Sequence, residues 1–147
     1  MNILEEINLK FPTRVSKATA TLPQSAAAAK FTITGGKVLI CEIVGEVTTA
    51  IEAGANNMKL ISNPTTGADV DLCAVVDIAA AAVGSMLHIT GTLSDAMVIT
   101  ASGAYESQSS VIAVAPGTID VSCSASKTGS VKWTCFYIPI DEGAKVV

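Results

Sequence analysis

The chain has 147 residues, enough for one domain with its own core. Half of the residues are hydrophobic, but only 15% are charged, well below the roughly 25% usual for soluble domains. The net charge is −4, and no lysine or arginine occurs between Lys59 and Lys127, which argues against direct binding to nucleic acid. Because a small monomer normally keeps its surface charged, this deficit favours an oligomer or a component of an assembly. Alternatively, the low charge reflects a monomer whose surface is made polar by Ser, Thr, Asn and Gly.

Residues 1–13 are predicted to form an arm in front of a single domain that spans residues 14–147. Apolar side chains alternate with polar ones along the arm, and Pro12 closes it. Such an arm can lie across a neighbouring subunit or fold back on its own domain, and the sequence leaves both possibilities open. The segment lacks the basic region and long apolar core of a signal peptide, so we expect a cytosolic protein with reduced cysteines.

Residues 14–62 show the period-two alternation of strands with one face in a core. Strands are predicted at 14–22, 30–34, 38–51 and 57–62, with the pair Gly35-Gly36 as a hairpin turn. In the long strand 38–51, Gly45 marks a bulge or a close approach. The side chains predicted to face the core there are Leu39, Cys41, Ile43, Val47 and Ile51, while Glu42 and Glu46 fall on the other face.

The second half of the chain is also strand-like. A strand at 68–78 places Val70, Leu72, Ala74, Val76 and Ile78 toward the core, and a helical turn follows at 78–83. Further strands are predicted at 86–93, 96–101, 110–114, 118–125 and 129–140. Nine or ten short strands with frequent turn signals indicate an all-β protein, a two-sheet β-sandwich. The jelly-roll type fits the count best, and another Greek-key topology stays open.

The last predicted strand is apolar on both faces. Val131, Trp133, Cys135 and Tyr137 share one face, and Phe136, Ile138 and Ile140 share the other. A strand that is apolar on both sides is buried on both sides. Its second face is therefore covered by a loop of the chain, by the arm or by another subunit.

Residues that point to catalysis or to a metal are few. His88, the one histidine, has no carboxylate close in sequence, and Cys41, Cys73, Cys123 and Cys135 lack the spacing of a zinc site. Asp69, Asp71 and Asp77 lack the pattern of a calcium loop. Glu42 and Glu46 stand about 13 Å apart along a strand, too far for a paired acid and base. We expect no enzyme activity, no cofactor and no metal.

The uncharged stretch 78–94 is too short for a membrane span.

Several phrases of the chain together resemble a known family. They are FTITGG (31–36), IVGEVTTAI (43–51), NPTTG (63–67) leading to VDLC (70–73), APGTID (115–120), TGSVKW (128–133) and YIPID (137–141). From about Arg14 to Ala144 the chain is similar to the small all-β decoration, or cement, proteins of tailed bacteriophages. The similarity contains no catalytic or ligand motif, and residues 1–13 fall outside it.

The resemblance implies a structural virion protein that binds the outer surface of the capsid and links major capsid protein subunits. It would be made in the cytoplasm of the host bacterium and act as a homodimer, or alternatively a trimer. Our hypothesis for the apolar anchors of this interface combines the arm with the last strand: Ile7, Leu9, Phe11, Trp133, Phe136 and Tyr137.

Two other functions remain open from the sequence. One is a tail, spike or head-fibre component, which would also be all-β and oligomeric. The other is a carbohydrate-binding sandwich without catalysis, for which Tyr105 is the one aromatic residue in a predicted loop.

Overall fold

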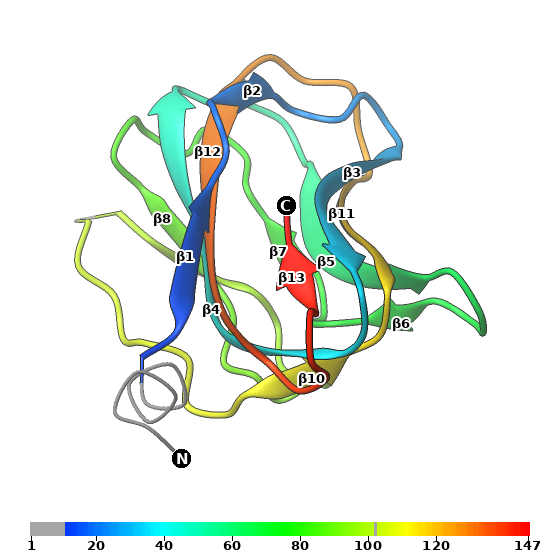
Figure 1. Ribbon diagram of the computed structural model, residues 1–147. Helices are drawn as coiled ribbons and strands as arrows, with labels where there is room; N and C mark the ends of the chain where they lie inside the picture. The colour runs from blue at the N-terminus through cyan, green and yellow to red at the C-terminus, as the bar shows by residue number, and fades with distance from the viewer. Residues whose placement is uncertain (1–10, 102) are drawn as a thin grey trace.

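Two antiparallel β-sheets pack face to face in the computed structural model, which describes residues 11–101 and 103–147 (Figure 1). Within those residues there is no helix. The prediction of an all-β, two-sheet sandwich is confirmed, whereas the jelly-roll type stays a prediction.

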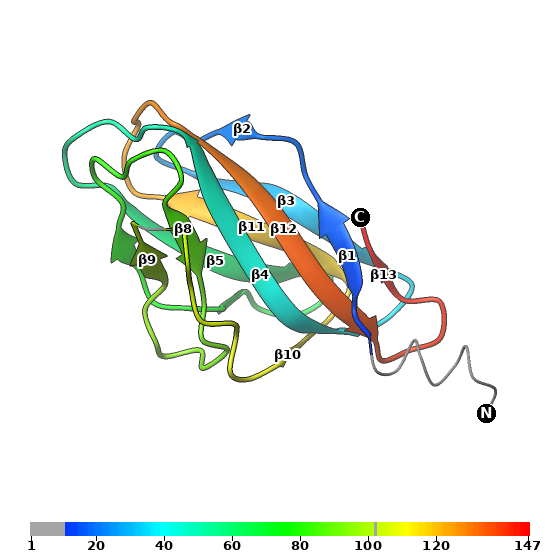
Figure 2. The same ribbon diagram turned by 90° about the vertical axis from the view of Figure 1, so that its left-hand side faces the viewer.

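The seven-stranded sheet is built around the two longest strands, β4 (Val38–Thr49) and β12 (Ser130–Pro139), which lie side by side along its face (Figure 2). The strands β1 (Thr13–Ser16) and β2 (Ala20–Thr21) pair with the free edge of β12. On the other side, β8 (Met86–His88) and β10 (Ile112–Val114) pair with different parts of β4, and β9 (Val98–Thr100) pairs with β8.

The six-stranded sheet has β11 (Gly117–Cys123) at its centre, between β3 (Ala27–Thr34) and β5 (Asn57–Pro64). The short strand β13 (Lys145–Val146) continues the sheet beyond β3. The two-residue strands β6 (Val70–Asp71) and β7 (Val76–Asp77) both pair with β5. Apolar side chains from both sheets form one core between them, in which Trp133 and Phe31 are the largest fully buried residues.

Several details differ from the sequence-based expectations. The segment 14–22 is divided into β1 and β2, and the segment 68–78 into β6 and β7. The two glycines at 35 and 36 do not close a hairpin, because the strands on either side of them belong to different sheets. Residues 78–83 form a turn without helix, in which Ala80 has a positive φ of 56°. Val70 and Ala74 are exposed instead of facing the core.

Bulges in β4 change which of its side chains face the core. Phe136 stands opposite Glu42, but the next residue, Tyr137, stands opposite Ile40, so Cys41 is an extra residue in the ladder. Before this bulge Val38 and Ile40 are buried, and after it Ile43 and Val47 are buried. The prediction for Leu39 and Cys41 was therefore wrong, since both are only half-buried, while Ile43, Val47 and Ile51 face the core as expected.

Candidate functional site: the outer face of the seven-stranded sheet

The strand β12 divides the proposed anchor residues between its two faces. Trp133 is 2% exposed and Tyr137 is 7% exposed, and both belong to the core between the sheets. A side chain can anchor a partner without a rearrangement of the fold only if it is already exposed in the free protein. Trp133 and Tyr137 therefore leave the candidate interface, and of the three predicted β12 residues only Phe136 points outward.

Phe136 belongs to an apolar group on the outer face of the seven-stranded sheet. Leu39 lies opposite both Ile138 on β12 and Ala113 on β10, so these three side chains form one row across the sheet. Val111 precedes the inward-facing Ile112 and is 56% exposed. We call this group the outer apolar patch: Leu39, Val111, Ala113, Phe136 and Ile138.

Residues near the N-terminus flank this patch. Arg14 on β1 stands directly opposite Phe136 and is exposed, so a guanidinium group borders the apolar surface. Phe11 is 66% exposed, as an anchor requires. The predicted anchors Ile7 and Leu9 lie outside the described residues. Thr13 already pairs with Tyr137, so the first strand starts one residue inside the predicted arm.

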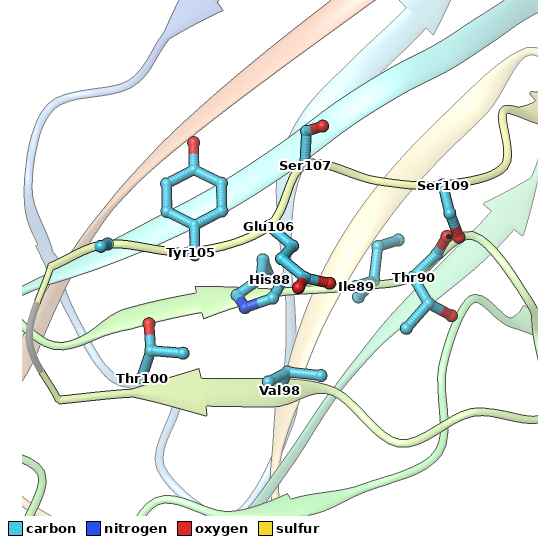
Figure 3. Close-up of a pocket in the computed structure, with 10 residues that line it drawn as sticks. His88, Ile89, Thr90, Val98, Thr100, Tyr105, Glu106, Ser107 and Ser109 are labelled. Atoms are coloured by element: carbon cyan, nitrogen blue, oxygen red, sulfur yellow. Dashed lines mark hydrogen bonds between the residues drawn. The ribbon is translucent and has the colours of Figure 1, made fainter.

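A loop formed by residues 103–111 lies over the other part of this outer face (Figure 3). Gln108 holds it to β4: its backbone N–H donates to Glu42 Oε2 at 2.9 Å, and its Nε2 donates to the Ile40 carbonyl at 3.0 Å. The backbone N–H groups of Ser109 and Ser110 both donate to the Thr90 carbonyl. These bonds fix the 108–110 end of the loop against the sheet.

Between the loop and the sheet there is a pocket of about 560 Å³. Its floor comes from β8, β9 and the residues after β8, and the loop supplies one wall (Figure 3). The lining residues are His88, Ile89, Thr90, Val98, Thr100, Ala104, Tyr105, Glu106, Ser107 and Ser109.

His88 lies at the floor of this pocket and is 5% exposed. Its ring lies 5.1 Å from the ring of Tyr105, centroid to centroid, at an angle of 38°. Neither His88 Nε2 nor Thr100 Oγ1 has a hydrogen-bond partner in the part of the chain that the structure describes, although both atoms are buried. Two atoms that form hydrogen bonds therefore stand unpaired beside a cavity.

Burial shifts the acid–base properties around the pocket. It lowers the pKa of His88, an effect that the nearby Glu106 carboxylate partly opposes. Burial also raises the pKa of Glu42, and the hydrogen bond from the Gln108 backbone N–H partly opposes this increase. The pKa of Tyr105 is raised by burial and, to a smaller extent, by the negative charge of Glu42. We expect a neutral His88 imidazole at neutral pH.

The remaining candidates from the sequence have structural roles. Asp71 forms an ion pair with Lys59 at 2.8 Å, and Asp77 Oδ1 accepts hydrogen bonds from the backbone N–H groups of Asn56 and Ala79. All four cysteines are free thiols. Among residues 11–101 and 103–147, no three His, Cys, Asp or Glu side chains come close enough together to hold a metal ion. No helix in the same residues has the length and apolar character to cross a membrane.

Sequence reasoning did not find the pocket. Its residues come from three separate segments. The sequence indicated only Tyr105 as a possible sugar contact, and His88 was considered only as a catalytic or metal-binding residue. No family model, curated protein or solved structure matches this chain.

Proposed function

We propose that the protein is a structural component of a tailed-phage virion, which binds the outside of the capsid and links major capsid protein subunits. It acts there as a homodimer and is made in the cytoplasm of the host bacterium. The outer apolar patch is the single observation that carries this proposal. The resemblance of short segments within residues 14–144 to capsid decoration proteins is the reason for proposing the major capsid protein as the partner.

The patch has the properties of a docking surface on a rigid support. It is centred on β4 and β12, the two longest strands, whose pairing fixes the relative positions of Leu39, Phe136 and Ile138. Side chains that are held in place by a sheet lose little conformational entropy when a partner covers them. Arg14 beside Phe136 would pair with a carboxylate on the partner. An apolar hollow with an acidic rim is thus the surface we expect on the capsid protein.

Repetition over a closed lattice strengthens a modest contact. A standard interface buries about 1,600 Å² in total, and a few well-packed side chains supply most of its energy. When a dimer contacts two capsid subunits, the second contact is intramolecular and gains from a high effective concentration. This is how a small domain without catalytic chemistry would reinforce a shell.

Undecorated capsids of the phage that encodes the protein provide the test. The purified protein is mixed with them, and the bound copies per capsid are counted as a function of concentration. Val111→Ser in the patch should weaken binding about 10-fold, because it removes an apolar contact at the docking surface. The matched control is Val70→Ser, since Val70 is a valine of similar exposure, 46%, on the six-stranded sheet.

The outcomes separate clearly. Absence of binding by the unmodified protein would overturn the proposal, and so would an equal loss from both valine variants. Removal of residues 1–10 tests the part of the arm that carries Ile7 and Leu9. A lower occupancy on capsids with unchanged unfolding supports the role of these two residues, and full occupancy contradicts it. Light scattering of the free protein at several concentrations tests the dimer.

A further inference from the structure

We propose that the pocket beneath the loop 103–111 is a binding site for an uncharged sugar unit. This inference does not depend on the proposed docking function, because none of the pocket residues belongs to the outer apolar patch. It rests on the cavity, on one unpaired buried atom in each of two residues that line it, and on the chemical character of the lining.

Two residues that line the pocket each hold a polar atom without a hydrogen-bond partner. An unsatisfied buried donor or acceptor costs free energy. Both His88 Nε2 and Thr100 Oγ1 carry this cost, and both residues line the cavity from adjacent strands, β8 and β9. Neither atom has accessible surface in the free protein, so a ligand would reach it after a rotation of the His88 or Thr100 side chain. A ligand hydroxyl, which donates as well as accepts, would then satisfy either atom whatever the tautomer of the imidazole.

The charge of the lining excludes most other ligands. Glu106 is the only charged side chain among the described residues that line the pocket, and Glu42 lies nearby under the same loop. A phosphate, a sulfate or an acidic sugar would meet negative charge without a compensating cation. A quaternary ammonium ion normally requires several aromatic faces, whereas Tyr105 is the one Phe, Tyr or Trp in the described lining.

The remaining groups match a pyranose. Five lining residues carry hydroxyl groups: Thr90, Thr100, Tyr105, Ser107 and Ser109. Those of Thr90 and Ser109 already donate to Asp95 Oδ2 and to the Thr90 carbonyl, so toward a ligand they are acceptors. The Glu106 carboxylate is a further acceptor for hydroxyls of a ligand. Val98 and the ring of Tyr105 provide apolar surface for the C–H face of a sugar. The volume of about 560 Å³ lies within the range of small-molecule sites and exceeds what one sugar ring fills.

The experiment is an NMR titration of the full-length protein with neutral sugars: glucose, galactose, mannose and N-acetylglucosamine, each as the free sugar and as an oligosaccharide. We expect chemical-shift changes confined to His88, Thr100 and residues 104–107, with a Kd of about 1 mM for a free sugar. Tighter binding of an oligosaccharide identifies the end of a glycan chain as the source. Equal affinities identify a single sugar. Both results support the site.

Two variants test the residues. Thr100→Val keeps the shape of the side chain but removes the unpaired hydroxyl, so it should lower sugar affinity about 5-fold while stability is unchanged or higher. Glu106→Gln should lower affinity about 10-fold, and Glu46→Gln, an exposed carboxylate on the same sheet outside the pocket, is its control. The proposal is overturned if no neutral sugar causes shifts at about 50 mM, if choline or glucuronate binds more tightly than they do, or if neither pocket variant changes affinity.

Discussion

Gly45 on β4 lies directly opposite Trp133 on β12, and the indole occupies the space beside its Cα. A Cβ added at position 45 would lie 3.0 Å from Trp133 Cη2 and 2.8 Å from Val131 Cγ1. Trp133 is thus accommodated in the core because the neighbouring strand carries no side chain at this point. Of the two roles predicted for Gly45, the close approach is correct and the bulge is wrong, since the bulges of β4 are at Cys41 and Thr48.

We predict that Gly45→Ala destabilises the protein by about 1–3 kcal/mol, the usual cost of overpacking a core. Trp133 and Val131 are both buried, so either side chain would have to displace other core atoms to make room for the methyl group. Urea unfolding monitored by tryptophan fluorescence measures the change as a lower midpoint with an unchanged slope. Glu46→Ala, at the adjacent exposed position, is the control and should change the unfolding free energy by less than about 0.5 kcal/mol. Equal stabilities for the two variants would contradict this account.

The sequence identified the sandwich because alternation is a local property of each strand. It misplaced Leu39 and Cys41 because a single bulge reverses the alternation, and no residue in β4 marks that bulge. Trp133 was proposed as an anchor because its residue type is common at interfaces. Only the register of β12 against Gly45 shows that the indole has a place inside the core.

The candidate site was less accessible to sequence reasoning than the fold. The outer apolar patch could be anticipated in part, because Phe136 and Ile138 were seen to form a second apolar face on the last strand. The contribution of β10 to that patch depends on pairing with β4 and has no sequence signal. The pocket depends on where the loop 103–111 crosses the sheet, and that position is fixed by contacts from Gln108 to β4 and from Ser109 and Ser110 to the Thr90 carbonyl.

Cys41 should be the cysteine that reacts first with an alkylating reagent in the folded protein. It is the only half-exposed one, whereas Cys73, Cys123 and Cys135 are buried. Burial raises the pKa of Cys123 to about 11 and that of Cys135 to about 12, so at pH 8 about one Cys123 thiol in a thousand is ionised. Mass spectrometry after brief treatment with iodoacetamide gives the order. All four cysteines should react at similar rates in denaturant, and native modification of Cys135 as fast as Cys41 would contradict the prediction.

The pKa of His88 should lie below 6.5 in the folded protein and fall further in the variant Glu106→Gln. Burial lowers this pKa, and the Glu106 charge partly raises it, so removal of the charge leaves burial less opposed. Because the folded protein binds this proton more weakly than the unfolded chain, His88 contributes stability above pH 6.5 that is lost as the pH falls through the folded-state pKa. His88 is the only histidine, so one imidazole NMR signal reports the titration. A higher pKa in Glu106→Gln than in the unmodified protein would refute the prediction.

Gln108→Ala should loosen the loop 103–111 without unfolding the domain. The substitution removes the hydrogen bonds from Nε2 to the carbonyls of Ile40 and Ser110, but it also removes Oε1, which is buried without a partner in the described chain. We therefore expect a global loss of only about 1 kcal/mol, together with about 10-fold faster hydrogen exchange at the amides of Ser109 and Ser110.

The chain offers a close control for that variant. Gln24 Nε2 also bridges two carbonyls, those of Leu22 and Lys127, at 2.8 and 3.0 Å, and Gln24 is not among the residues that line the pocket. Gln24→Ala should cause a similar or smaller loss of stability and leave exchange at Ser109 and Ser110 unchanged. If both variants accelerate exchange there equally, the loop opens only by global unfolding, and Gln108 is not its specific anchor. If only Gln108→Ala does so, the bonds to β4 hold the wall of the pocket in place.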